Sequence, residues 1–124
     1  MGWKAELVKA FFVAFGAFQT FANLSYLVRK NGVIYARKQH REMPDDASDR
    51  QMKVKMAGMF MFGLLMLVTG LVSYLIRSYY EMGFVIVMGL FAVYVFAEAV
   101  YYKYWRTTGA FILVLSLFMI ILFV

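Results

Sequence analysis

The sequence contains no cysteine, one proline and one histidine. Without cysteine the chain has no disulfide, no cysteine-ligated zinc or iron–sulfur cluster and no catalytic thiol. With a single histidine, His40, one chain cannot supply two histidine ligands to a haem. The sequence also lacks the motifs of serine hydrolases, phosphate-binding glycine loops and zinc peptidases. We therefore predict no cofactor and no metal site, and we do not expect an enzyme.

Charge is scarce as well, because 16% of the residues are charged and 64% are hydrophobic. A soluble domain is about half apolar and about a quarter charged. The hydrophobic residues also form uninterrupted blocks rather than the spaced pattern of one buried helix face. Residues 56–76 carry no charge, and a helix of this length crosses the ~30 Å apolar core of a bilayer. The composition predicts an integral membrane protein.

Four such blocks are present, at about 7–28, 56–76, 84–102 and 110–124. We predict an all-α, four-transmembrane-helix bundle that forms a single domain over 1–124, with a loop over 29–55. The last block covers only about 22 Å as a helix, so it must thin the bilayer or include the turn before it. We expect this last helix at the lipid-facing edge of the bundle.

The net charge of +6 is unevenly distributed along the chain. Ten basic residues lie in the first loop and in the turn before the last span, and only Lys4, Lys9 and Arg77 lie at the other ends of the spans. Because cytoplasmic loops are enriched in Lys and Arg, we predict both basic loops in the cytoplasm and both termini outside, in the cell membrane. This distribution explains the charge without nucleic acid as a partner.

The first part of the long loop is strongly basic. Its cations are Arg29, Lys30, Arg37, Lys38 and Arg41. They either determine topology alone or also bind anionic lipid headgroups, for which each cation near the surface contributes about 1 kcal/mol. His40 is expected to be a solvent-exposed loop residue.

The second helix should begin near Asp49, because Ser48 and Gln51 match the capping-box pattern. Residues spaced alternately four and three apart then form a seam of the kind found in left-handed helix packing. The seam residues are Met52, Met56, Met59, Gly63, Met66, Gly70 and Ser73. Small residues let helices approach closely, so the seam packs either on a helix of the same chain or on another subunit or partner.

Polar residues inside the spans are the candidate site. Gln19 and Asn23 are four residues apart, so they share a helix face with neighbouring Thr20 and should point away from lipid. Glu98 is the acid within a span, and such a group is a functional candidate by default. It lies four residues from the end of its span, so it serves either a structural ion pair or a proton- or substrate-linked role. Its expected partners are Arg29, Lys30 and Lys103.

Residues 21–26 and 96–101 have similar sequences, F-A-N-L-S-Y and F-A-E-A-V-Y. If the chain contains a duplicated hairpin, Asn23 and Glu98 occupy equivalent positions. They would then lie at similar depth in the membrane.

Two functions stay open at this point. The first is an interaction subunit, regulator or immunity-type partner, which acts through helix packing as a homo-oligomer or within a larger membrane complex. The second is a homo-oligomeric transporter or channel for a cation, a drug-like molecule or a lipid, in which Glu98 and the Gln19/Asn23 face line the path. Four short helices enclose little volume, so the second function predicts more than one chain.

Overall fold

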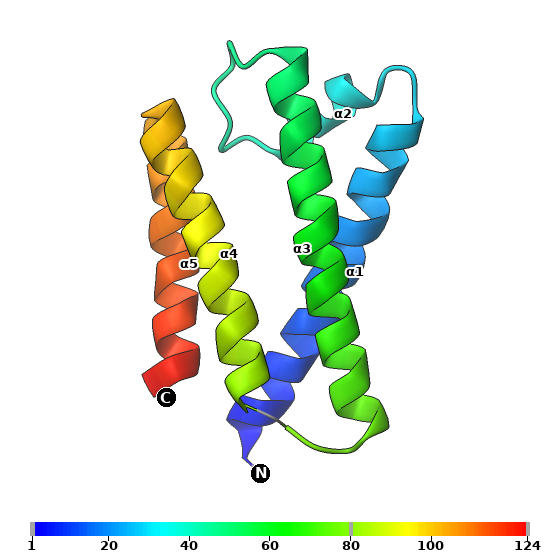
Figure 1. The fold of residues 1–124 in the computed structure, drawn as a ribbon, viewed down its shortest axis with the longest axis vertical. Helices are drawn as coiled ribbons and strands as arrows, with labels where there is room; N and C mark the ends of the chain where they lie inside the picture. Colours follow the sequence, from blue (N-terminus) through cyan, green and yellow to red (C-terminus); the bar gives the residue numbers. More distant parts are fainter. Residues whose placement is uncertain (1, 80, 124) are drawn as a thin grey trace.

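The computed structural model describes residues 2–79 and 81–123, which contain helices and connecting segments but no strand. The helices are α1 Trp3–Val28, α2 Gly32–Gln39, α3 Asp49–Leu75, α4 Glu81–Tyr102 and α5 Trp105–Phe123. Four of them, α1, α3, α4 and α5, are long and apolar enough to cross a membrane. The chain is therefore a multi-pass membrane protein. Its two termini lie toward the same end of the bundle, opposite α2 (Figure 1).

The helices extend beyond the apolar blocks. The last helix begins at Trp105 and therefore includes the preceding turn, so its 19 residues span about 28 Å. Helix α3 begins at Asp49 as predicted, with the capping box formed: Gln51 N donates to Ser48 Oγ at 3.1 Å and Ser48 N donates to Gln51 Oε1 at 2.8 Å. The segment 29–55 is accordingly not one loop, because it contains α2 and the first turns of α3.

Helices α1 and α3 pack tightly against each other. All seven seam residues of α3 are buried, and Gly63 faces Gly16 of α1. A methyl group on Gly16 would lie 2.5 Å from Leu67 N and 2.7 Å from Gly63 O, which are both backbone atoms. The two helices can approach this closely only because neither residue carries a side chain. The seam is thus a contact between two helices of one chain.

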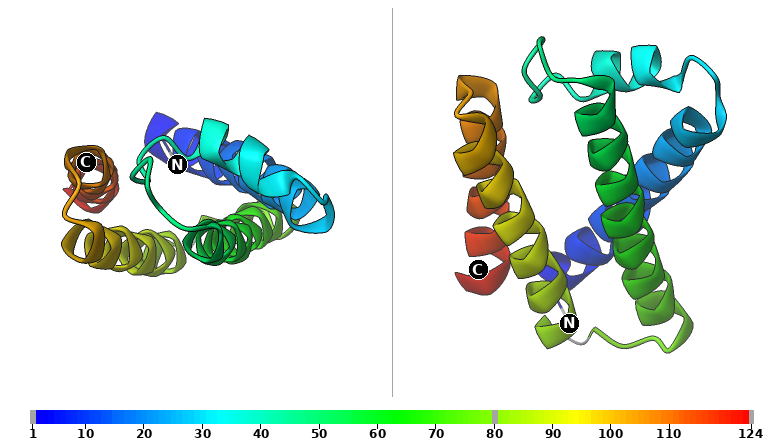
Figure 2. Two further views of the ribbon diagram at one scale, coloured as in Figure 1. Left: turned by 90° about the horizontal axis from the view of Figure 1, so that it is seen from above. Right: turned by 45° about the horizontal axis from the view of Figure 1, so that its top comes forward.

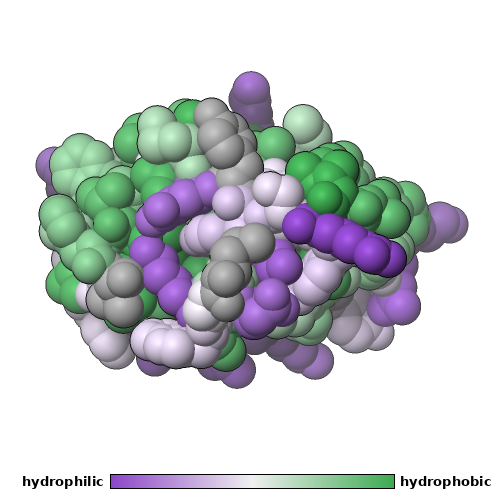
Figure 3. All heavy atoms as spheres, turned by 90° about the horizontal axis from the view of Figure 1, so that it is seen from below, coloured by the Kyte–Doolittle hydropathy of each residue, from purple (hydrophilic) through white to green (hydrophobic). Residues whose placement is uncertain are grey.

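Helices α4 and α5 form a second antiparallel pair, and α5 lies at the edge of the bundle (Figure 2). Aromatic rings join the two pairs from the middle of the bundle toward the termini. Phe12 and Phe84 have ring centroids 4.7 Å apart, and Phe91 lies 6.1 Å from Phe15 and 5.3 Å from Phe62. Large apolar side chains are exposed along all four long helices. Figure 3 shows the end opposite α2, where polar residues gather near the centre and hydrophobic residues lie mainly to the left, above and to the upper right of them.

The segment after α1 folds back against the bundle. Gly32 makes this turn possible, because a Cβ there would collide with the carbonyl group of Tyr26. Further on, Met43 and Ala47 are buried in a small apolar cluster with Ala36, Met52 and Met56. Burial of these side chains fixes the segment between α2 and α3 against the bundle, and this segment carries His40 and Glu42 inward.

Candidate functional site: a buried polar cluster beside a membrane-facing cavity

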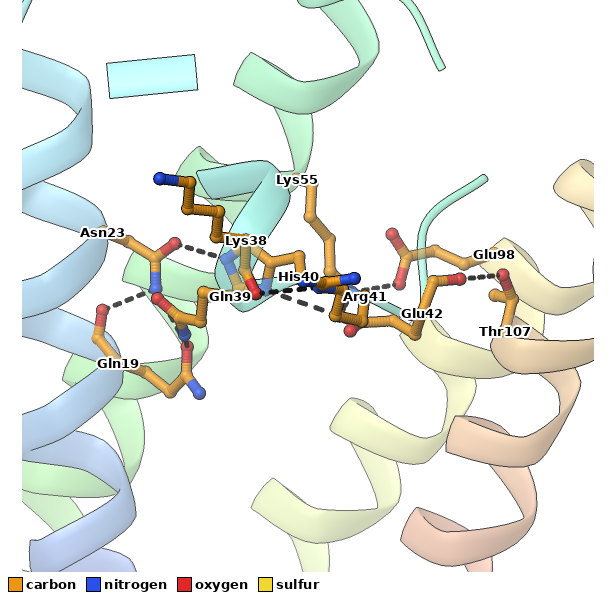
Figure 4. A network of polar contacts seen from close by, with 10 residues as sticks. All are labelled: Gln19, Asn23, Lys38, Gln39, His40, Arg41, Glu42, Lys55, Glu98 and Thr107. Atoms are coloured by element: carbon orange, nitrogen blue, oxygen red, sulfur yellow. Dashed lines mark hydrogen bonds and ion pairs between the residues drawn. The ribbon is translucent and has the colours of Figure 1, made fainter. Parts of the chain in front are cut away.

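His40 occupies the centre of a buried polar cluster (Figure 4). Only 3% of its surface is exposed, so the expectation of a solvated loop residue is wrong. The reason is that the apolar neighbours Met43 and Ala47 hold the segment inside, and the ring finds polar partners on both sides. His40 Nε2 lies 2.7 Å from Asn23 Oδ1, and His40 Nδ1 lies 3.4 Å from Glu42 Oε1.

The first half of the cluster comes from α1 and the end of α2. Asn23 is fully buried and donates through Nδ2 to Gln19 O at 2.7 Å and to Gln19 Oε1 at 2.9 Å. Gln39 Nε2 donates to the same Gln19 Oε1 at 3.0 Å. The predicted polar face of α1 therefore points into the bundle, where its partners are the end of α2 and His40.

The second half of the cluster connects the two helix pairs. Lys55 Nζ of α3 lies 2.6 Å from Glu98 Oε1 of α4 and 3.1 Å from Glu42 Oε1. The Thr107 hydroxyl of α5 donates to the Glu42 carbonyl oxygen. Glu98 is 8% exposed, and its cation is Lys55 rather than the expected Arg29, Lys30 or Lys103. Lys55 is the basic residue buried beside it, whereas those three are exposed.

Glu42 remains ionised at neutral pH. Its burial by itself would raise the pKa, but the hydrogen bond with His40 and the positive charge of Lys55 outweigh this effect. Together they lower the pKa of Glu42 from 4.5 to about 2. A partly buried carboxylate held in its charged form is stabilised by positive charge nearby, and Lys55 is shared between Glu42 and Glu98.

The cluster forms one wall of a cavity of about 370 Å³ between α1, α3, α4 and α5. Its polar wall consists of Gln19, Gln39, His40, Glu42 and Lys55, and its remaining lining is apolar. Two lining residues, Phe18 of α1 and Leu113 of α5, are 57% and 62% exposed. The cavity is therefore open between α1 and α5, which carry exposed apolar side chains on their outer faces.

A second cavity of about 650 Å³ lies between α3 and α4. Glu98, Tyr94 and Arg50 are among its lining residues. Glu98 lines this second cavity while its partner Lys55 lines the first. The Lys55–Glu98 ion pair therefore separates the two cavities.

The other predicted site residues lie outside the cluster. Thr20 is buried, and its hydroxyl has no hydrogen-bond partner among the described residues. Arg29, Lys30, Lys38 and Arg41 are exposed around α2. Arg37 instead holds the segment before α3 in place, since it donates to Ala47 O at 2.5 Å and pairs with Asp49 at 3.1 Å.

Sequence reasoning identified Gln19, Asn23 and Glu98, and it missed the residues between them. Lys55 gave a detectable signal, because it follows Met52 by one helical turn and borders the buried seam. His40 and Glu42 gave none, because they lie in a polar segment without periodicity. No protein-family model, curated protein or solved structure matches this chain.

Proposed function

We propose that this protein binds an amphiphilic molecule, lipid-like or drug-like, which enters from the bilayer, and that this binding is the first step in moving the molecule. The observation that carries the proposal is the cavity between α1 and α5, which has an apolar lining, one polar wall and an opening toward lipid. Its volume of about 370 Å³ falls within the range of small-molecule sites. An apolar body fits the lining, and a polar end meets the buried cluster.

The position of the Lys55–Glu98 ion pair supports carriage in addition to binding. The pair lies between two cavities, and it bridges α3 of one helix pair and α4 of the other. A ligand that competes for either partner weakens this bridge and lets the helix pairs separate locally. The lining residues of the cavity all come from one chain, so the proposed site needs no second subunit.

Binding to purified protein in phosphatidylcholine nanodiscs tests the proposal. The probes are radiolabelled single-chain amphiphiles with ammonium, hydroxyl or carboxylate heads. Ala110→Phe fills the cavity from α5, because Ala110 is one of its lining residues. Ile112→Phe adds a ring on the exposed outer face of the same helix and serves as the control. Saturable binding that Ala110→Phe abolishes and Ile112→Phe retains supports the proposal, and equal binding by both variants refutes it.

We also propose that the end carrying α2 faces the cytoplasm and that the membrane is the cell membrane. The excess of Lys and Arg at this end supports the orientation. Because the chain has no cysteine, single cysteines at Asp46 and Ser78 can be labelled from either face of intact cells. The expected result is labelling from opposite faces, with Ser78→Cys reactive from outside. Labelling of both positions from one face contradicts the orientation.

The alternative, an interaction subunit or regulator, stays a prediction. The small-residue seam was its main support, and α1 covers that seam within the chain. Mass measurement of the protein extracted with its native neighbours into mild detergent tests both this role and the homo-oligomer. A defined complex with another chain favours the interaction role.

A further inference from the structure

The hydrogen bonds around His40 place one ring proton on Nε2. Both Nδ2 donor contacts of Asn23 go to Gln19, so the Asn23 oxygen faces the ring and accepts from His40 Nε2–H. In a neutral imidazole Nδ1 is then an acceptor. Here Nδ1 faces the Glu42 carboxylate at 3.4 Å, and two acceptors repel each other. A second proton on Nδ1 converts this repulsion into a charge-assisted contact.

The net charge of the cluster also favours the doubly protonated form of His40. Glu42 and Glu98 contribute two negative charges and Lys55 one positive charge, so the cluster carries −1 with His40 neutral and 0 with His40 protonated. A small hollow on the other side of His40 is bordered by Arg37, Arg41 and Asp45. These three are at least partly exposed, and solvent screens them. Among the described residues, α1 and α5 add no charged group to the cluster, and the nearby cations Lys38 of α2 and Arg50 of α3 are exposed to solvent. The buried balance therefore depends on one proton at His40.

The cavity wall also presents an acceptor that has no donor. Gln39 Oε1 is buried and has no hydrogen-bond partner among the described residues, and Gln39 lines the cavity. A metal ion does not fit this wall, because within residues 2–79 and 81–123 no three His, Asp or Glu side chains are grouped to hold one. A positively charged organic group with N–H donors fits both the free acceptor and the excess negative charge.

We propose that the ligand of this cavity is an organic cation with an apolar body, and that it binds in exchange for the second proton of His40. This inference rests on the proposed function, since it assigns the charge of the same ligand. The exchange balances, because one positive charge enters with the ligand and one proton leaves Nδ1 for solvent. The cluster has zero net charge in both states.

The charge of the ligand is tested first on the unmodified protein. Dodecylammonium, 1-dodecanol and dodecanoate share one chain and differ in head charge, and each is measured in phosphatidylcholine nanodiscs at pH 8. The expected affinity of dodecylammonium exceeds that of 1-dodecanol by about tenfold to a hundredfold, because a unit charge interacts strongly with a carboxylate in a partly buried site. Tighter binding of 1-dodecanol or dodecanoate refutes the cation and leaves the cavity as a general amphiphile site.

The exchange is tested by pH and by proton release. Because the ligand displaces one proton, dodecylammonium is expected to bind more weakly at pH 5.5 than at pH 8. A pH indicator in weak buffer should detect up to one proton released per ligand bound. His40→Gln removes the exchangeable proton and leaves the cluster at −1, so the affinity of this variant should be independent of pH over the same range.

The outcomes separate the exchanging group, the binding site and the ligand charge. If His40→Gln keeps the pH dependence, or if no proton is released on binding, His40 is not the exchanging group. If all three dodecyl probes bind equally to Ala110→Phe and Ile112→Phe, the cavity is not the binding site and the proposed function fails with the inference. The measurements on the unmodified protein decide the ligand charge even if His40→Gln does not fold.

Discussion

The contact between α1 and α3 depends on two glycines that face each other, which makes Gly16→Ala a sharp test of the packing. An added methyl group on Gly16 would lie 2.5 Å from Leu67 N, 2.7 Å from Gly63 O and 2.9 Å from Leu67 Cα. All three are backbone atoms of α3, which cannot rotate away as a side chain does. The substitution must therefore shift one helix relative to the other.

Two opposing effects determine the size of the change. Replacing glycine by alanine inside a helix stabilises the helix by up to about 1 kcal/mol. Overpacking a close contact costs about 1 to 3 kcal/mol, and a rigid backbone partner favours the upper end of that range. The expected net loss for Gly16→Ala is about 2 kcal/mol in the free energy of unfolding. Gly63→Ala should cost a similar amount, because its methyl group would lie 2.7 Å from Gln19 Cβ and 2.9 Å from Thr20 N.

The double variant gives the sharpest result. A methyl group on Gly16 or on Gly63 would obstruct the same close approach of α1 and α3. Once one methyl group has displaced the helices, the second costs less, so the losses in the free energy of unfolding do not add. Equilibrium unfolding in mixed micelles with increasing sodium dodecyl sulfate measures all three variants. Gly89→Ala is the matched control, because the nearest atom to its methyl group is a Phe118 ring carbon at 3.4 Å. If Gly16→Ala is as stable as Gly89→Ala, the backbone contact between α1 and α3 is wrong.

Three further predictions concern the cluster and its supports. The lowering of the Glu42 pKa from 4.5 to about 2 contributes at most about 3 kcal/mol of stability. This contribution is present above pH 4.5 and is lost as the pH falls toward 2. In unfolding measurements over this range, the free energy of unfolding of Glu42→Gln should therefore depend less on pH than that of the unmodified protein. Lys55→Met leaves the buried Glu98 and the partly exposed Glu42 without their shared cation and should lower the free energy of unfolding by about 3 kcal/mol, with partial recovery when Glu98→Gln is added. Ser48→Ala removes the side-chain cap of α3 and should cost about 1 kcal/mol in the same assay, and an unchanged value would show that the cap adds no stability.

Hydropathy predicted the parts of the fold that lipid itself requires. The four long helices follow from blocks of uncharged residues, since backbone groups in the bilayer must be satisfied within the helix. The start of α3 followed from local chemistry, because Ser48 and Gln51 satisfy each other without help from the rest of the chain. The α3 seam was visible as spacing. Which helix covers that seam was not, because small residues permit close approach by any helix.

The short helix α2 shows where such reasoning stops. It is eight residues long and lies outside the apolar blocks, so neither its length nor its hydropathy distinguishes it from a loop. Its stability comes from contacts made elsewhere, namely the burial of Ala36 against Met52 and Met56 and the close approach of Gly32 to α1. Those contacts exist only once the helices have packed.

The candidate site contains residues of both kinds, those that the sequence indicates and those that it does not. Gln19 and Asn23 on α1 and Glu98 on α4 lie within apolar stretches of the sequence, so each needs a polar partner, and that need is evident from the sequence. Their partners lie in charged segments, where a histidine, a glutamate or a lysine is ordinary and attracts no notice. The acid Glu98 calls for a cation near the end of an adjoining helix. Lys55 is one of the cations that meet this condition. The same condition does not identify His40. His40 contacts Asn23 only because burial of Met43 and Ala47 places its segment between the helix pairs.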